Sequence, residues 1–198
     1  EEYRQLSTSI ARRNHPQRPD AEITRIARAN YELGARSLLE KTLAECKRLR
    51  PRTKWGFYNW PHDDAQPEKL DWLWRSITAF YPVCYTIHKT APDGRSGDGY
   101  APAAHYLARV KATVEGARRV AGPDRPVIAL VWVRYHDMNP VFGNQFLDQP
   151  DLERMLQAPL DDGADGLAFW DAIGTKELAD QYREYLRKSL VPALRSLR

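Results

Sequence analysis

Aromatic and polar side chains gather where four short apolar runs of the sequence end. The runs close on Tyr58-Asn59-Trp60, on Tyr85 and His88, on Arg134-Tyr135-His136-Asp137 and on Trp170-Asp171. A pyranose ring has an apolar face of C–H groups that stacks on an indole or phenol, and its hydroxyls need directed polar partners. These residue types therefore predict a sugar-binding site, and the alternative is that the rings are ordinary core.

Cleavage of a sugar polymer would need further groups. A carboxylic acid must protonate the leaving oxygen, and an oxocarbenium-like transition state must be stabilised. Where the sugar carries a 2-acetamido group, its own carbonyl can be the nucleophile, and a phenol such as Tyr58 or Tyr85 can hold that group in place. The acids near the run ends qualify by location alone, because such residues also cap helices and solvate loops. They are Asp63, Asp64, Asp137 and Asp171.

Other chemistries have weaker support. The groups His62-Asp63-Asp64 and His136-Asp137 lack the i, i+4 histidine spacing of a helical zinc site. The sequence has no nucleophile elbow, phosphate loop or dinucleotide fingerprint. We therefore expect no metal and no cofactor.

The elements that must position these residues alternate along the chain. Apolar residues at helical spacing predict helices, and short apolar or aromatic runs predict strands. Helices are expected at 20–50, 67–80, 102–121, 151–160 and 175–190, the last continuing past or breaking near Pro192. Strands are expected at 54–60, 83–87, 127–133 and 166–170.

This alternation predicts an α/β fold with a parallel sheet and right-handed crossovers. Four strands are too few to close a barrel, and a complete (β/α) barrel takes about 250 residues. The 198 residues therefore suit one partial domain, residues 1–198, forming half of a TIM-like barrel. The competing architecture is a small open α/β sheet that is complete in itself.

Composition sets outer limits on the class of protein. The chain is 42% hydrophobic and 28% charged, which is ordinary for a globular domain. No run approaches the roughly 18 apolar residues of a membrane helix. The net charge of +4 is spread over helices, which is typical of a solvated surface and compatible with an anionic polysaccharide.

Two cysteines, Cys46 and Cys84, predict no disulfide framework. The chain starts without Met or a leader, so a signal peptide would have to lie upstream.

Several motifs follow one another along the chain. They are Leu49-Arg50-Pro51, Trp55-Gly56-Phe57-Tyr58-Asn59-Trp60-Pro61, Leu70-Asp71-Trp72-Leu73-Trp74, Tyr81-Pro82-Val83-Cys84-Tyr85, Arg109-Val110, Arg125-Pro126-Val127 and Gly163-Ala164-Asp165-Gly166-Leu167-Ala168-Phe169-Trp170. In this order and spacing they resemble the hyaluronidase family of endo-β-N-acetylhexosaminidases, and the resemblance covers about residues 21–173.

The resemblance implies the C-terminal half of a (β/α) TIM-like barrel and a role for three aromatic residues. Tyr58 would line the site beside the catalytic acid, Tyr85 would orient the substrate acetamide, and Trp170 would form the wall of the subsite for the cleaved sugar. We class Tyr58 and Tyr85 as catalytic and Trp170 as substrate-binding. Further substrate-binding candidates from the strand ends are Trp60, Asn59 and Asp171.

The sequence also departs from the family pattern. The family's Asp-x-Glu, which supplies the proton donor, belongs on a strand before the long first helix and is missing there. The cysteine that usually follows the family's Pro-Asp is absent, since the chain reads Pro61-His62-Asp63.

We expect a secreted or extracytoplasmic parent enzyme that cleaves hyaluronan or chondroitin-like polymers by substrate-assisted retention, and no activity from these residues alone. We expect no nucleic-acid partner. The alternatives are a non-catalytic carbohydrate-binding barrel and a small α/β hydrolase that uses Asp137 or Asp171.

Overall fold

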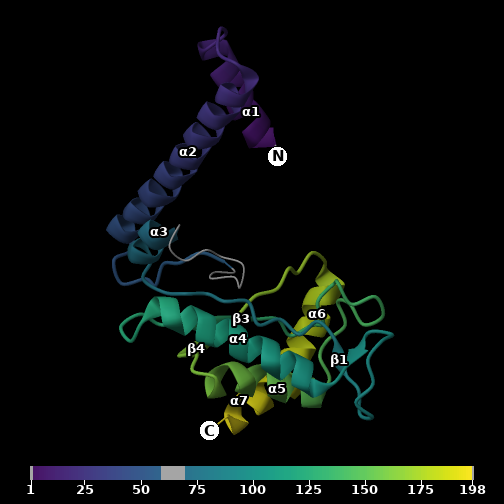
Figure 1. The fold of residues 1–198 in the computed structure, drawn as a ribbon. Coiled ribbons are helices and arrows are strands. Elements are labelled where there is room, and N and C mark those ends of the chain that lie inside the picture. Colours follow the sequence, from purple (N-terminus) through teal and green to yellow (C-terminus); the bar gives the residue numbers. More distant parts are fainter. Residues whose placement is uncertain (1, 59–69, 198) are drawn as a thin grey trace. The chain divides into compact units, whose positions relative to one another are not determined.

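The computed structural model describes residues 2–58 and 70–197, which form two compact units (Figure 1). The first unit contains the described residues 2–55 and 70–76. The second contains residues 56–58 and 77–197. The predicted site residues that are described all belong to the second unit.

The first unit is helical. Helix α1 (Glu2–Asn14) packs against α2 (Asp20–Leu49), and α3 (Asp71–Ser76) is a short helix. The small core between α1 and α2 is Ala11, Ile23 and Ala27. Helix α2 begins after Pro19 with acidic residues in its first turn and ends before Pro51 with basic residues in its last turn, as favourable interaction with the helix dipole requires.

The structure of this unit differs from the sequence prediction in two places. Helix α1 was not predicted, although Tyr3, Leu6 and Ile10 recur at helical spacing; the signal is weak because all three stay exposed and only Ala11 is buried. The crossover helix expected at 67–80 is described only as Asp71–Ser76, after a turn at Leu70. Its expected end is already extended chain, because the Phe80 N–H donates to Pro126 O at 2.9 Å.

Parallel strand pairing organises the second unit, as predicted. Strand β3 (Ile128–Val131) pairs in parallel with β4 (Gly166–Phe169) in the register Ile128 to Gly166. On its other side β3 meets residues 80–83 through the parallel bridges Phe80–Val127 and Val83–Leu130. A further parallel bridge joins Tyr58 to Tyr81. The four extended segments therefore lie side by side in chain order.

The first two predicted strands are shorter than expected. Residues 54–60 and 83–87 contribute single bridges and no continuous ladder among the described residues. Pro82 explains part of the difference, because it has no N–H to donate to a neighbouring strand. The Pro82 carbonyl oxygen instead accepts a hydrogen bond from the Leu130 N–H at 2.8 Å.

Helices cover the strands of the second unit. Helix α4 (Ala103–Ala121) buries Val110, Val114 and Ala117, and α5 (Gln149–Asp161) packs against α4, β3 and β4. A two-residue pair, β1 (Lys89–Thr90) with β2 (Tyr100–Ala101), closes the loop before α4 and was not predicted. Gly99, in that loop, has φ of 80° and lies against Asn139, a conformation that suits glycine.

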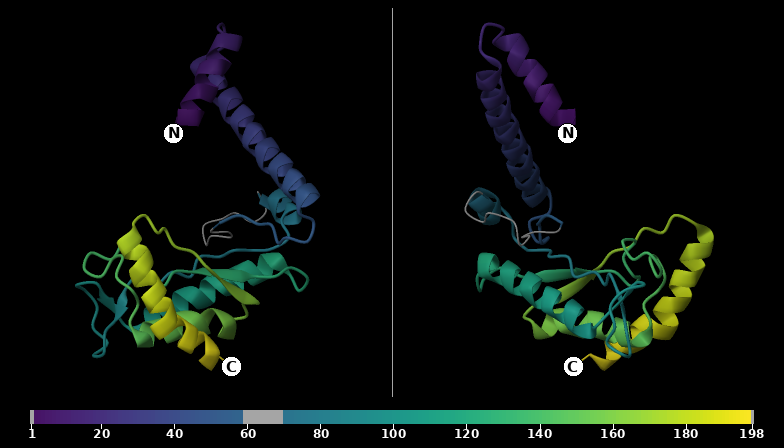
Figure 2. Two further views of the ribbon diagram at one scale, coloured as in Figure 1. Left: turned by 180° about the vertical axis from the view of Figure 1, so that it is seen from behind. Right: turned by 45° about the vertical axis from the view of Figure 1, so that its right-hand side comes forward.

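The C-terminal helix is continuous but changes its winding. Helix α6 (Lys176–Tyr185) passes through a π-helical turn at Leu186–Leu190 into α7 (Val191–Ser196), as the yellow ribbon shows (Figure 2). Of the two predicted alternatives, the helix continues past Pro192, and proline at the second position of α7 fits a turn in which the normal hydrogen-bond ladder is interrupted. Among the described residues no helix combines the length and apolar character needed to cross a bilayer.

Candidate functional site

Aromatic rings converge at the carboxyl ends of the parallel strands, with Tyr85 at their centre. Its ring centroid lies 6.4 Å from that of Tyr58 and 6.4 Å from that of Trp170, and the latter pair is stacked at 21°. Trp132 and His136 complete the group at 5.7 and 5.8 Å from Tyr85. These five residues are called the aromatic cluster below. The structure therefore brings Tyr58, Tyr85 and Trp170 together, as the sequence predicted.

The members of the aromatic cluster differ in exposure. Tyr58 and Trp170 are 57% and 48% exposed, whereas Tyr85 is buried. An exposed phenol and an exposed indole on either side of a buried ring leave apolar faces open to a ligand. This arrangement suits stacking against a sugar ring better than it suits a closed core.

Two buried donors in the aromatic cluster have no acceptor within the part of the chain that the structure describes. Among the described residues, neither the Tyr85 hydroxyl nor the Trp132 indole N–H makes a hydrogen bond of normal geometry. Leaving a buried polar group unpaired costs about 1–3 kcal/mol, so such groups are rare in stable folds. Both donors are therefore suited to an acceptor on a bound molecule.

Electrostatics keep the Tyr85 phenol protonated. Burial raises its pKa above the usual value, and interaction with the Tyr58 hydroxyl and the charge of Asp171 raises it further. A phenol with a raised pKa remains a hydrogen-bond donor over the whole physiological range. Tyr85 can donate to a carbonyl oxygen, but it is poorly suited to act as an anionic nucleophile.

Asp171, predicted to bind substrate, is instead held by Arg134. The Arg134 Nε donates to Oδ2 at 3.1 Å and its Nη2 donates to Oδ1, and the Asp171 side chain is only 4% exposed. Arg134 also lies over the Trp132 ring, 4.9 Å from its centroid. With both carboxylate oxygens engaged, Asp171 positions the adjacent Trp170 and does not suit direct contact with a sugar or the role of acid.

The remaining residues at the end of β3 divide into two groups. Tyr135 turns away from the aromatic cluster, and its hydroxyl donates to Asp151 at 2.7 Å in the interior. His136 stays in the cluster and lies 2.8 Å from Asp137, a carboxylate that is mostly exposed. Tyr135 is therefore structural, and His136 is a part of the site.

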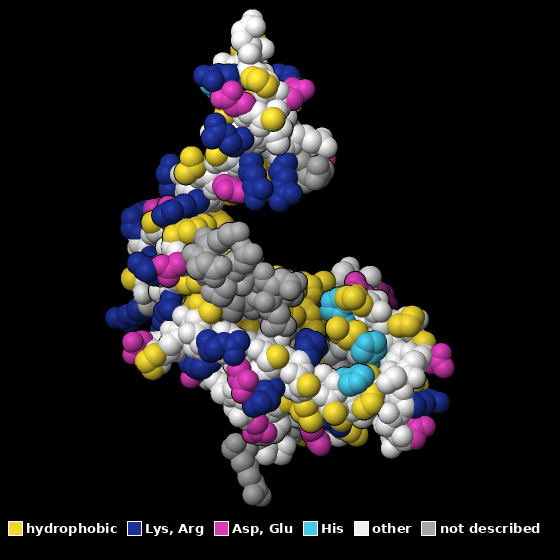
Figure 3. Space-filling view, in the orientation of Figure 1, with side chains coloured by type: hydrophobic (Ala, Val, Ile, Leu, Met, Phe, Trp, Pro, Cys, Tyr) yellow, Lys and Arg dark blue, Asp and Glu magenta, His cyan; other side chains and the backbone are white. Residues whose placement is uncertain are grey.

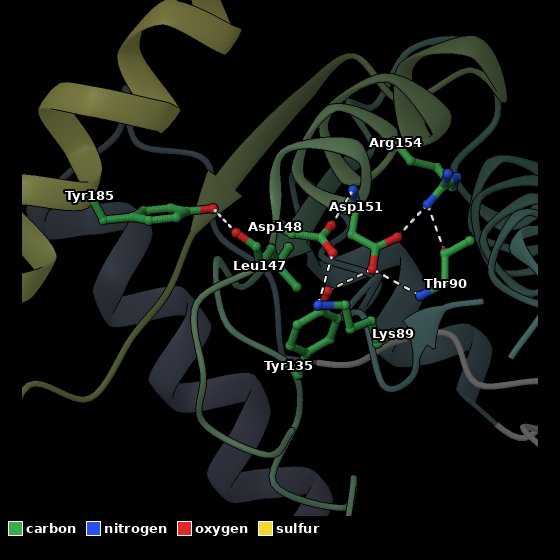
Figure 4. A network of polar contacts seen from close by, with 8 residues as sticks. All are labelled: Lys89, Thr90, Tyr135, Leu147, Asp148, Asp151, Arg154 and Tyr185. Atoms are coloured by element: carbon green, nitrogen blue, oxygen red, sulfur yellow. Dashed lines mark hydrogen bonds and ion pairs between the residues drawn. The ribbon is translucent and has the colours of Figure 1, made fainter. Parts of the chain in front are cut away.

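A network of polar contacts centred on the buried Asp151 fixes the surrounding loops (Figure 4). The Asp151 carboxylate accepts from Tyr135, from the Thr90 backbone N–H at 3.0 Å and from Arg154. Arg154 also donates to the Thr90 hydroxyl at 2.8 Å. Beside them Lys89 pairs with Asp148, the N-cap of α5, at 3.1 Å. This network attaches β1 to the start of α5, so the loop that follows the predicted strand segment 83–87 has a rigid base.

Several predicted positions lie outside the described residues. These are Asn59, Trp60, His62, Asp63 and Asp64. Gly56, two residues before Tyr58, is needed for close packing of the chain. A Cβ there would lie 2.1 Å from Ala79 O and 2.9 Å from the Tyr81 ring, so glycine allows the neighbouring segments to approach.

Trp132 is the site residue that the sequence interpretation missed. It follows β3 directly. The sequence interpretation included it in the expected buried strand 127–133. The signal was an indole at a strand end, the same feature that identified Trp170. Among the described residues, no group of three histidine, cysteine or acidic side chains is arranged to hold a metal ion.

Comparison with known proteins identifies relatives of the chain. Residues 1–64 match the family model described as hyaluronidase. The chain is 30% identical to the hyaluronidase of Apis mellifera, over 98% of its own length and 53% of the relative. It is 23% identical to inactive hyaluronidase B of Vespula vulgaris, over 94% of its own length and 57% of the relative.

A solved structure agrees with these relatives. The crystal structure of bee venom hyaluronidase in complex with a hyaluronic acid tetramer superposes with a TM-score of 0.76 at 27% identity. The match covers 98% of this chain and 63% of that chain. The chain therefore spans about half to two thirds of the length of these relatives, and it is related to the hyaluronidases in sequence and in fold.

Proposed function

Starting from this relationship to the hyaluronidases, we propose that the chain is part of a glycoside hydrolase. Its substrates are β-linked N-acetylhexosamine polymers such as hyaluronan or chondroitin. The observation that carries the proposal is the convergence of Tyr58, Tyr85 and Trp170 at the ends of parallel strands. A hyaluronidase of similar fold has been crystallised with a hyaluronic acid tetramer, which supports the choice of substrate.

The geometry supports a separate role for each ring. The protonated Tyr85 hydroxyl, which is buried and has no acceptor among the described residues, donates to the acetamide carbonyl and orients it for attack on the anomeric carbon. Trp170 offers an indole face to the sugar, and Tyr58 lines the position beside the acid. Asn59 and Trp60 are proposed as substrate contacts from the sequence alone.

We place the proton donor outside these residues. Asp20-Ala21-Glu22 and Asp151-Leu152-Glu153 have the Asp-x-Glu spacing, but they lie in helices α2 and α5 and not at a strand end. In this proposal the four parallel segments are the C-terminal half of a (β/α) barrel, and the partner half supplies the acid. The parent protein acts outside the cytoplasm, where its polymer substrates occur.

A non-catalytic carbohydrate-binding protein is the second candidate. It is favoured by one observation, that a relative over nearly the whole chain is described as an inactive hyaluronidase. The aromatic cluster would serve binding equally well without an acid. The two candidates therefore differ in whether a catalytic acid is present, and both bind the same kind of sugar.

The test is hyaluronan depolymerisation by the parent protein, measured by size-exclusion chromatography of the polymer. We expect cleavage that is abolished when the glutamate of its Asp-x-Glu is changed to glutamine. Binding without cleavage in the unaltered protein would support the second candidate. Depolymerisation by the 198-residue chain alone would show that the acid lies within it and would refute its proposed placement.

A further inference from the structure

A pocket beside the first turns of α4 shares no lining residue with the aromatic cluster. Its volume is about 240 Å³, and its surface is mainly apolar, with several polar or charged side chains in its wall. The polar lining consists of His88, Thr90, His105, Tyr106 and Arg109. The pocket is smaller than the roughly 300–1,000 Å³ typical of drug-sized ligands, so it suits a single ring.

Arg109 gives the pocket its positive charge. Its guanidinium donates to the Tyr85 carbonyl oxygen and lies over the Tyr106 ring, 5.6 Å from the centroid. Within the described part of the chain, Arg109 has no carboxylate at ion-pair distance. A partly buried guanidinium with spare donors and no counter-charge is suited to an oxyanion supplied by a ligand.

Two histidines add donors at the mouth of the pocket. His88 and His105 are exposed and come from the end of the second strand segment and the first turn of α4. Figure 3 shows histidine side chains gathered on one face of the second unit among hydrophobic ones. The pocket therefore combines apolar wall, histidine donors and one cation, as a sugar with an acidic group requires.

The nearest acidic network does not cancel this charge. Asp151 accepts from Arg154, Tyr135 and the Thr90 N–H, so its carboxylate is already neutralised in the interior. Arg154 extends from that network to the Thr90 hydroxyl in the pocket wall. The pocket is thus held in shape by a buried network and keeps its own positive charge.

We infer that this pocket binds the oxyanion of an acidic sugar, a carboxylate or sulfate carried on one pyranose ring. The choice of a sugar rests on the proposed function, since Arg109 contacts the backbone of Tyr85, the central residue of the aromatic cluster. A polymer with regularly spaced acidic groups can then engage both places. The pocket is a second point of attachment and takes no part in bond cleavage.

The experiment measures binding to the 198-residue chain by NMR of the histidine ring protons. The probes are methyl β-D-glucuronide, methyl β-D-glucoside 6-sulfate and neutral methyl β-D-glucoside, which differ only at C6. We expect the acidic probes to shift the His88 and His105 signals, and the neutral probe to leave them unchanged. His15, exposed on the first unit, is the internal control. A shift by only one acidic probe identifies which group the pocket takes.

Variants connect the binding to the pocket. Arg109→Gln should weaken binding about tenfold or more, because a charge-assisted hydrogen bond is lost. Arg119→Gln, at an exposed arginine on the same helix, should have no effect. Because Arg109 also holds the Tyr85 carbonyl, His105→Gln is a second variant that leaves that contact intact, and it should weaken binding a few-fold.

Two results would overturn the inference. One is an equal response to the acidic and neutral probes, or no response to any of them. The other is undiminished affinity for the acidic probes in both pocket variants. Neither result depends on hydrolysis, so failure here is separate from failure of the proposed glycosidase activity.

Discussion

Arg134 and Asp171 form a two-point ion pair in the interior, with side chains 7% and 4% exposed. The pair joins the end of β3 to the end of β4, directly beside Trp132 and Trp170. It therefore fixes the two indoles of the aromatic cluster relative to each other.

Removal of one partner should be costly. Asp171→Ala leaves the Arg134 charge buried and uncompensated, and we expect a loss of about 3–5 kcal/mol in the free energy of unfolding. Urea denaturation followed by tryptophan fluorescence measures it. The exposed pair Arg183–Asp180 is the control, and Asp180→Ala should cost less than about 1 kcal/mol. Equal effects of the two substitutions would contradict the structural role given to Asp171.

The two buried tyrosines should respond in opposite ways to loss of the hydroxyl. Tyr135→Phe breaks the hydrogen bond to Asp151, so we expect a loss of about 1–3 kcal/mol in stability. Tyr85→Phe removes a hydroxyl that has no partner among the described residues, so stability should be unchanged or increased. Thermal and urea unfolding of both variants tests this contrast.

The same Tyr85→Phe change should reduce activity in the parent protein. Loss of one positioned donor lowers kcat by about 10²–10³ in comparable sites. We expect the effect mainly in kcat, because the acetamide must be aligned for reaction. A tyrosine with no role beyond packing would leave hyaluronan turnover unchanged.

Trp170→Ala should separate binding from stability. The indole is 48% exposed, so its removal should leave the unfolding midpoint nearly unchanged. Affinity of the parent protein for a hyaluronan tetrasaccharide should fall about tenfold through loss of stacking. Tyr3→Ala, at an exposed ring in the first unit, is the control. Unaltered affinity in Trp170→Ala would remove this residue from the site.

Asp165 should make stability fall in acid. Burial raises its pKa, but hydrogen bonds from Arg118 and the Val127 N–H outweigh burial, and the net pKa is lowered. A carboxyl whose folded pKa lies below the unfolded value of about 3.9 adds stability above that pH and loses it as the pH falls. Asp165→Asn should therefore show a smaller drop in urea midpoint between pH 5 and pH 3 than the unaltered chain.

Cysteine reactivity tests the burial of the second strand segment. Burial raises the pKa of the Cys84 thiol to about 12, so almost no thiolate exists at pH 8. Iodoacetamide should label the partly exposed Cys46 first and Cys84 only after unfolding. Mass spectrometry of the labelled peptides measures the rate of labelling at each cysteine. Equal rates at Cys46 and Cys84 would disprove the burial of Cys84.

Local sequence signals determined the order of elements and the residues at the strand ends. Helix α2, helix α4 and the pair β3–β4 follow from periodic apolar residues, capping charges and proline positions, all of which act within a few residues. The same alternation placed Tyr58, Tyr85 and Trp170 at one edge of a parallel sheet. Family resemblance then connected those rings to an amino sugar.

Only the tertiary structure decided which side chains are free to bind and which are internal supports. Asp171 and Arg134 are separated by 37 positions in the chain, and Tyr135 and Asp151 by 16, so no local pattern reveals that they are partners. The sequence interpretation placed Trp132 in a buried strand, and only the structure shows that its indole N–H has no acceptor among residues 2–58 and 70–197. Such roles depend on burial and on partners from distant segments, and these exist only after the chain has folded.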